Sequence, residues 1–230
     1  MNTKRNIVVT SGLALVAVVA IAFLARSPSP RDGALAAREQ AMEMLGLQIA
    51  KLLPKCKVLV LSNPFTKRAG YFDEKCQYER ASIRGLRKGL GKGSSVTVVF
   101  PEIRPEYFAN PQSFAIPPDS RTPLSFLMQP SSVDQLAEAH PECRVIVSLI
   151  GLPAGVHRLK IWNEKESRSF ALLLPDLRLL GPPAQAVESF QQGKLLAAVH
   201  YDPQLSGDPL IVTKDNILEV LEKQPGVLGY

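Results

Sequence analysis

Five short runs of continuously apolar residues constrain the fold of this chain more than any other feature. Strands that alternate apolar and polar residues have one wet face, whereas continuously apolar strands are buried on both faces. Segments with a helical pattern separate the runs, which predicts a parallel sheet covered by helices on both sides. The runs occupy residues 57–62, 95–100, 144–150, 170–174 and 195–199.

The segments between the runs carry apolar residues at three- and four-residue spacing, the period of a helix that packs on one face. Ser132 and Gln135 have the spacing of a capping box at a helix start. We therefore expect a doubly wound, mostly parallel five-stranded α/β sheet of the Rossmann-like type. Its helices are expected at 34–53, 80–90, 132–140, 182–193 and 214–223.

Two segments do not fit this alternation. Residues 101–130 form a long, Pro-rich excursion between two strands. Residues 151–169 contain the single tryptophan and leave two interpretations open, a short helix or an extra hairpin at the edge of the sheet.

The N-terminal segment predicts a membrane anchor. Lys4 and Arg5 precede an apolar run from Ile7 to Ala25, close to the roughly 20 residues that cross the hydrocarbon core as a helix. The same layout fits a cleaved secretory signal with a site at Ala22, but the length of the run favours an uncleaved signal anchor at 1–25. The positive-inside bias then places the rest of the chain outside the cytoplasm, in the periplasm of a bacterial cell.

The remaining chain is long enough for one domain with its own core. Residues 26–33 form a Pro- and Ser-rich linker, and we expect a single α/β domain at 34–230. The chain has 27 Lys and Arg residues against 21 Asp and Glu residues, a net charge of +6. Residues 1–33 hold four of the basic and one of the acidic residues, so the remainder carries 23 and 20, a net charge of +3. Half of the positive excess belongs to the targeting segment, and we expect no nucleic-acid partner.

No catalytic, cofactor or metal motif has a functional spacing. The glycines of 85–95 end a helix and precede a strand, the reverse of the order in a phosphate-binding loop. The three histidines have no second ligand at metal-binding spacing. Ser62, His200 and Asp202 follow neighbouring strands, but Ser62 lacks the strand–turn–helix elbow that activates a serine. We therefore expect a protein that is not an enzyme and that uses no cofactor and no metal.

The cysteines leave two interpretations open. PKCKVLVLS (54–62) and PECRVIVSL (141–149) each place Pro, then Cys, then a basic residue before an apolar run. If the two strands are parallel neighbours, Cys56 and Cys143 lie at the same height of the sheet, within reach of a disulfide. Export would permit such a bridge. The alternative is that both are small buried residues that close the end of the sheet.

Polar and aromatic residues follow the apolar runs. In a doubly wound sheet, ligands bind beyond the carboxyl ends of the strands. Side chains there can donate and accept hydrogen bonds, and aromatic rings can pack on an apolar face of a ligand. The predicted ligand-binding residues are Asn63, Phe65, Glu102, Arg104, Asp176, Tyr201 and Asp202.

Several segments resemble a known family. VLVLSNPF (58–65), the helix containing IRGLRKGL (83–90) and the run SVTVVF (95–100) are similar to the opening of type I periplasmic sugar-binding proteins and of the effector-binding domain of lac-repressor-like regulators. VESFQQGKLLAAVHYDP (187–203) resembles their later helix–Gly–strand segment. An insertion at 66–79 departs from the family pattern.

The resemblance implies a single lobe of a periplasmic-binding-protein-like fold, because the chain is much shorter than the two-lobed family. It also implies that Asn63, Phe65 and Asp202 contact a ligand. A single lobe cannot close on its ligand by a hinge.

Two functional classes follow from these observations. The first is a membrane-anchored, extracytoplasmic binding module that takes a small polar, sugar-like ligand or a partner protein at the strand ends. The alternative is a structural or assembly component of a cell-envelope complex, in which 101–130 forms protein contacts. An anchored hydrolase is the least favoured class. A deep polar crevice would favour the first class, and a shallow crevice together with an exposed apolar patch on 101–130 the second.

Overall fold

The computed structural model describes residues 29–67, 73–163, 168–202 and 208–230. The predicted anchor at 1–25 lies outside these residues, as do residues 26–28 of the predicted linker, and residues 30–33 of that linker belong to the helix α2 (Pro30–Leu52). Within the described ranges, no helix combines the length and the apolar character that a membrane crossing requires. The chain separates into two compact units, Met1–Ala34 and Leu35–Tyr230, and the second contains the sheet.

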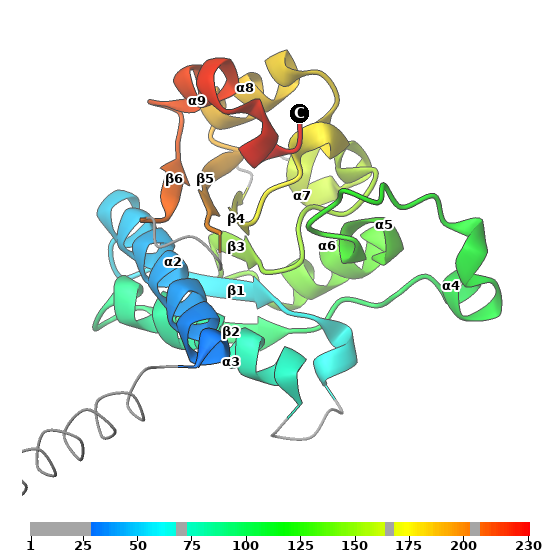
Figure 1. The fold of residues 1–230 in the computed structure, drawn as a ribbon, viewed down its shortest axis with the longest axis horizontal. Coiled ribbons are helices and arrows are strands. Elements are labelled where there is room, and N and C mark those ends of the chain that lie inside the picture. Colours follow the sequence, from blue (N-terminus) through cyan, green and yellow to red (C-terminus); the bar gives the residue numbers. More distant parts are fainter. Residues whose placement is uncertain (1–28, 68–72, 164–167, 203–207) are drawn as a thin grey trace, which may run out of the picture. The chain divides into compact units, whose positions relative to one another are not determined.

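The described residues form one six-stranded sheet in the order β2-β1-β3-β4-β5-β6 (Figure 1). The five predicted strands are present and parallel, which confirms the mostly parallel α/β sheet. They are β1 (Lys57–Leu61), β2 (Ser95–Val99), β3 (Val145–Ser148), β4 (Ser169–Leu173) and β5 (Leu195–His200).

The prediction of five strands was wrong by one edge strand. β6 (Leu210–Val212) pairs antiparallel with β5, with Ala198 opposite Val212. Leu210 and Ile211 are half-buried, and Val212 is buried. Three residues with this pattern are too short to be distinguished from a loop by periodicity.

Side chains of each central strand alternate between two hydrophobic cores. Val58 and Val60 are fully buried in the core beneath α2 (Pro30–Leu52) and α3 (Glu74–Leu90). Leu59 and Leu61 are fully buried in the core on the opposite face. The helices that contribute to this second core are α6 (Pro130–Ala139), α7 (Lys160–Asn163), α8 (Pro183–Gln191) and α9 (Ile217–Lys223).

Helices α2 and α3 approach each other so closely that glycine is needed at the contact. A Cβ atom on Gly85 would lie 2.0 Å from the Glu39 carbonyl oxygen, and one on Gly89 would lie 2.0 Å from the Glu43 carbonyl oxygen. The carboxylates of the same two glutamates form ion pairs with Arg84 at 2.8 Å and Lys88 at 2.7 Å. Basic side chains of α3 therefore bind α2 beside the glycine contact.

Three helices begin earlier than the sequence predicts, and the first of them, α2, begins at Pro30 instead of residue 34. α3 begins at Glu74, because Asp73 caps it by accepting a hydrogen bond from the Lys75 backbone N–H at 2.9 Å. α6 begins at Pro130, so Ser132 lies within the first turn and the predicted capping box is wrong. Its hydroxyl instead accepts a hydrogen bond from the Glu102 backbone N–H at 3.0 Å and donates one to the Gln129 carbonyl at 2.9 Å.

The irregular segments contain short helical turns. The Pro-rich segment holds α4 (Pro105–Ala109), η2 (Pro111–Ser113) and α5 (Leu124–Leu127). Of the two interpretations of 151–169, the described residues give the short helix, α7, preceded by η3 (Val156–Arg158). The remaining turns are η1 (Pro64–Thr66), η4 (Leu177–Leu180) and η5 (Pro225–Leu228).

Candidate functional site

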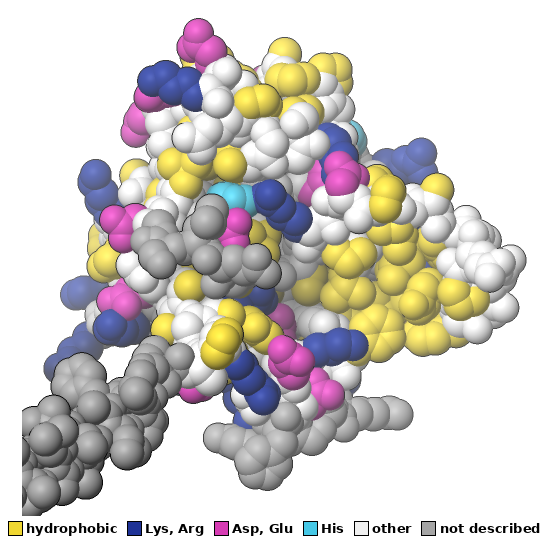
Figure 2. Space-filling view, viewed as in Figure 1, with side chains coloured by type: hydrophobic (Ala, Val, Ile, Leu, Met, Phe, Trp, Pro, Cys, Tyr) yellow, Lys and Arg dark blue, Asp and Glu magenta, His cyan; other side chains and the backbone are white. Residues whose placement is uncertain are grey.

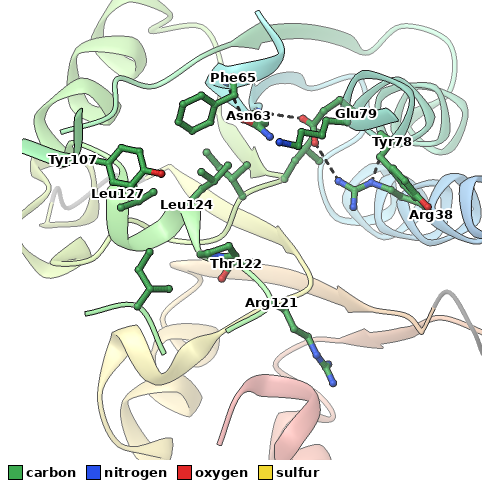
Figure 3. Close-up of a pocket in the computed structure, with 15 residues that line it drawn as sticks. Arg38, Asn63, Phe65, Tyr78, Glu79, Tyr107, Arg121, Thr122, Leu124 and Leu127 are labelled. Carbon is green, nitrogen blue, oxygen red and sulfur yellow. Dashed lines mark hydrogen bonds and ion pairs between the residues drawn. The ribbon is translucent and has the colours of Figure 1, made fainter. Parts of the chain in front are cut away.

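A pocket of about 520 Å³ lies at the carboxyl end of the sheet, where β1 and β3 are neighbours (Figure 3). From β1 the chain continues to β2 on one side of this pair, and from β3 it continues to β4 on the other. This reversal is a topological switch point, and the crevice beyond it is where ligands bind in open α/β sheets.

The pocket has walls from opposite sides of the switch point. Asn63 and Phe65 follow β1, and Leu149 and Ile150 follow β3. In Figure 3, Tyr78, Glu79 and Arg38 extend from α3 and α2 on one side, while Tyr107 and Leu127 stand on the other. The remaining lining residues are Lys75, Ile116, Arg121, Thr122, Pro123 and Leu124.

The turn after β1 places Asn63 and Phe65 at the pocket. The side-chain oxygen of Asn63 accepts a hydrogen bond from the Phe65 backbone N–H at 2.9 Å, and Pro64 occupies the first position of η1. The Thr66 hydroxyl donates to the Asn63 carbonyl at 2.7 Å. These bonds fix the turn. Within the described residues the side-chain N–H₂ group of Asn63 has no hydrogen-bond partner, and Phe65 is 42 % exposed.

A buried ion pair supports this turn. Glu79 accepts a hydrogen bond from Arg38 Nη2 at 3.2 Å through one carboxylate oxygen. Its other oxygen accepts from the Ser62 hydroxyl and from the Asn63 backbone N–H. Arg38 Nε also donates to the Ser82 hydroxyl at 2.6 Å. The network links α2, α3 and the end of β1, and the three charge-assisted bonds to Glu79 hold the pocket wall in place.

Two of the predicted ligand-binding residues, Asn63 and Phe65, line the pocket. Tyr201 is buried behind it, where its hydroxyl accepts a hydrogen bond from Arg38 Nη1 at 3.4 Å. Asp202 is exposed and lies near His200, on which it acts electrostatically.

The structure does not bring Glu102, Arg104 or Asp176 to this pocket. Glu102 and Arg104 follow β2, which is an edge strand one position beyond the switch point. Arg104 Nε donates to the Met128 carbonyl at 3.3 Å.

Asp176 takes part in a separate polar cluster after β4. It forms an ion pair with Arg178 at 2.8 Å and accepts a hydrogen bond from Ser120 at 2.9 Å. Burial raises the pKa of Asp176, but the hydrogen bonds from Arg178 and Ser120 outweigh burial and hold that pKa below its usual range. Burial, with Asp176 nearby, raises the pKa of Tyr230 to about 12. The Tyr230 hydroxyl donates to the carbonyls of Leu177 and Gly181 at 3.0 Å.

The sequence-based search missed most of the polar lining. The rule that selects residues at strand ends cannot select Arg38, which lies in the middle of the chain's first described helix, or Arg121, which lies in the Pro-rich segment. Lys75 and Glu79 lie in a polar stretch with no apolar periodicity. The Asp73 cap was a usable signal that a helix begins there.

Arg121 contacts a neutral histidine. Its Nη1 atom lies 2.8 Å from His200 Nδ1. A guanidinium can only donate, so the ring nitrogen accepts and the imidazole is neutral. Burial and the charge of Arg121 both lower the pKa of His200. Ser62 is bound to Glu79 and His200 to Arg121, so Ser62, His200 and Asp202 do not form a catalytic triad.

Cys56 and Cys143 lie two residues before Val58 and Val145, which are paired in neighbouring parallel strands. Both cysteines are buried free thiols, and burial raises the pKa of each. A bridge between them stays a prediction. The described part of the chain contains no cluster of three side chains suited to a metal ion.

Neither a protein-family model nor a curated protein sequence matches the chain. Solved structures do match its fold. A galactofuranose-binding protein is 11 % identical with a TM-score of 0.50, and the match covers 85 % of this chain and 64 % of that one. A carbohydrate transporter from Acidothermus cellulolyticus 11B, in complex with myo-inositol, is 13 % identical with a TM-score of 0.49 over 83 % and 62 % of the two chains.

The chain therefore spans less than two thirds of the length of these proteins. The likeness to the galactofuranose-binding protein confirms the fold that the short sequence segments suggest, a single lobe of the kind found in sugar-binding proteins.

Proposed function

We propose that this protein is a membrane-anchored, extracytoplasmic binding module whose pocket at the β1–β3 switch point takes a small polar ligand such as a sugar. The main support for this proposal is the position of the pocket, because doubly wound sheets bind ligands at the switch point. Its volume of about 520 Å³ falls within the range of roughly 300–1,000 Å³ that is typical of ligand sites.

The lining offers both kinds of contact that a sugar uses. The half-exposed ring of Phe65 presents an apolar face for the C–H groups of a sugar ring. The free side-chain N–H₂ of Asn63 and the cationic groups of Lys75 and Arg121 can donate hydrogen bonds to hydroxyl oxygens. Most of the remaining wall is aliphatic, which is the usual composition of a ligand pocket.

The location of the protein is proposed from its first 25 residues. Lys4 and Arg5 on the near side of the apolar run favour an orientation that leaves the domain outside the cytoplasm. In that place the pocket would meet extracytoplasmic solutes. Membrane fractionation of cells that express the tagged protein tests the anchor, and recovery of the whole chain in the soluble fraction would contradict it.

The binding proposal is tested by isothermal titration of the full chain with a panel of neutral and charged sugars. A ligand that binds in the pocket should lose affinity several-fold to about tenfold in Phe65→Ala, because the stacking face is removed. Phe108→Ala is the matched control, since Phe108 is an exposed aromatic residue outside the pocket lining. Equal loss in both variants, or no binding across the panel, would refute the proposal.

One observation supports the second candidate function, an assembly component. Phe108 on α4 is 65 % exposed, and Tyr107 packs edge-on against Phe108 and Phe114 with ring centroids 5.7 and 5.9 Å apart. Figure 2 shows hydrophobic side chains gathered on the part of the surface where Figure 1 places α4 and the segment after it. Exposed apolar patches on soluble domains commonly mark protein contacts.

A photo-crosslinking residue at position 108 tests this second function. An assembly role predicts one discrete crosslinked product in intact membranes. The same probe in place of Leu218, which is also 65 % exposed but lies on α9, should give no such product. Identical crosslinking patterns from the two positions would remove the support for an assembly role.

A further inference from the structure

We propose that the ligand of this pocket is anionic, a sugar ring that carries a carboxylate or a phosphate group. The inference rests on the proposed function, and it specifies the ligand class that the same pocket selects. The evidence for an anionic ligand is the presence of two cationic side chains in the pocket lining, Lys75 and Arg121.

The charge of the pocket lining is not balanced. Among the described residues that line it, Arg38, Lys75 and Arg121 are cationic and Glu79 is anionic. Arg38 and Glu79 neutralise each other at 3.2 Å, with side chains only 12 % and 10 % exposed. Lys75 and Arg121 remain, and the described chain gives neither of them a carboxylate partner.

In the described chain no acidic residue near these two cations in sequence forms an ion pair with either of them. Asp73 accepts a hydrogen bond from the Lys75 backbone N–H at 2.9 Å, and Glu74 is exposed. Glu79 is paired with Arg38 at 3.2 Å, and Asp119 with Arg178 at 2.8 Å. The pattern also differs from that farther along α3, where Arg84 and Lys88 each face a glutamate of α2. Helix α3 therefore pairs Arg84 and Lys88 with glutamates of α2, whereas no ion pair is formed by Lys75 in the described chain.

Arg121 is held in a way that preserves its charge. Its partner His200 is half-buried and accepts a hydrogen bond as a neutral ring, so it orients the guanidinium without neutralising it. The other N–H donors of Arg121 can form the paired bonds that carboxylates and phosphates accept. In Figure 3, Arg121 lies on the opposite side of the pocket from Asn63 and Phe65, and its side chain extends away from them at the edge of the pocket.

The volume of the pocket and its apolar wall favour a ligand that is larger than an inorganic anion and partly apolar. A pocket of about 520 Å³ with Phe65, Tyr107 and Leu124 in its wall would stay largely unfilled by an inorganic ion. A ring packs against these side chains while its charged substituent meets Lys75 and Arg121. Two cations without a carboxylate partner favour such a ligand over a neutral sugar by charge attraction, and salt screens this attraction because both side chains are exposed.

The test is isothermal titration of the full chain with four probes: glucose, glucuronate, glucose 6-phosphate and inorganic phosphate. At low salt, at least one of the two charged sugars should bind about tenfold or more tightly than glucose, and comparison of the two identifies the preferred anion. The advantage should shrink as salt is raised. Inorganic phosphate should bind more weakly than the preferred charged sugar, because it leaves the apolar wall uncovered.

Matched variants locate the effect. Lys75→Gln and Arg121→Gln should each weaken binding of the charged sugar about tenfold more than they weaken binding of glucose, because the amide can still donate a hydrogen bond to a hydroxyl but carries no charge. Lys92→Gln is the control, because it removes the same charge from an exposed turn outside the pocket. Thermal melting of each variant confirms that it is folded.

Each outcome decides between the two proposals. If glucose binds as tightly as both charged sugars, or if the pocket variants lose no more affinity than Lys92→Gln, the anionic ligand is wrong and the binding function stands. Equal binding of inorganic phosphate and the charged sugars would also overturn the inference. If neither these probes nor any member of the wider sugar panel binds, the inference and the binding function are both wrong.

Discussion

Substitution of Gly85 by alanine should destabilise the domain, although alanine is the better helix former. The new Cβ would lie 2.0 Å from the Glu39 carbonyl oxygen. That oxygen belongs to the backbone of α2, so no side-chain rotation relieves the clash. The two helices would have to separate by about 1 Å or more, and overpacking of this kind costs roughly 1–3 kcal/mol or more.

Alanine regains about 1 kcal/mol of helix propensity. A second clash within the same contact adds to the cost, because the Cβ also lies 2.9 Å from the Glu39 carbonyl carbon. The net loss in the free energy of unfolding should therefore be about 1–2 kcal/mol at least. For a domain of this size, such a loss lowers the melting temperature by roughly 2–8 °C.

Thermal unfolding of the full chain, followed by circular dichroism, measures this effect. Gly33→Ala is the control: it is also a glycine of α2, but a Cβ there meets no atom within 4 Å. That variant should melt at or above the wild-type temperature. If Gly85→Ala melts as high as Gly33→Ala, the close contact between α2 and α3 is not what the structure describes.

Three further predictions follow from the polar groups. Glu79→Gln should lower the free energy of unfolding by about 2 kcal/mol in chemical denaturation, because Arg38 loses its buried counter-charge. The pKa of His200 lies below its ordinary value in the folded state, so the unfolded state binds the proton first. Stability should therefore fall as pH drops below about 6.5, and His200→Gln should flatten this part of the profile. Burial raises the pKa of Cys56 and Cys143, so alkylation at pH 8 should be slow until the protein unfolds; rapid alkylation of the native chain would contradict their burial.

The strands were predictable because burial on both faces leaves a strong mark on the sequence. Val58, Leu59, Val60 and Leu61 are all fully buried, and a short run of apolar residues bounded by turn signals is typical of such a strand. β6 left no comparable mark, because Val212 is its only fully buried residue. The start of α3 was missed for the same reason, since its first turns are polar and only Asp73 indicates a helix.

The candidate site was predictable only in part. Asn63 and Phe65 follow a strand directly, so the topology of the sheet selects them without knowledge of tertiary contacts. Arg38 and Glu79 are 41 residues apart and meet only because α2 packs on α3. Asp176 also follows a strand, but a local ion pair with Arg178 occupies it. The switch point decides which strand ends contribute to the pocket. Its position depends on the order of the strands in the sheet, and this order is a property of the tertiary structure.

Each functional class has one structural feature in its support, although the pocket is more apolar than the polar crevice expected for ligand binding. The pocket at the switch point favours ligand binding, while the exposed Phe108 favours a protein contact on the Pro-rich segment. The two surfaces are connected through Tyr107, which lines the pocket and packs against Phe108. Phe65→Ala tests ligand binding in the pocket, and the crosslinking probe at position 108, with Leu218 as its control, tests the protein contact.

A crystal structure of the full chain with a bound sugar tests the central claim most directly. We predict electron density for the ligand between Phe65 and Arg121, with a hydrogen bond from the side chain of Asn63. Density at the polar cluster of Asp176 and Arg178, or a ligand bound on the surface of α4 with the switch-point pocket filled by solvent, would contradict the claim.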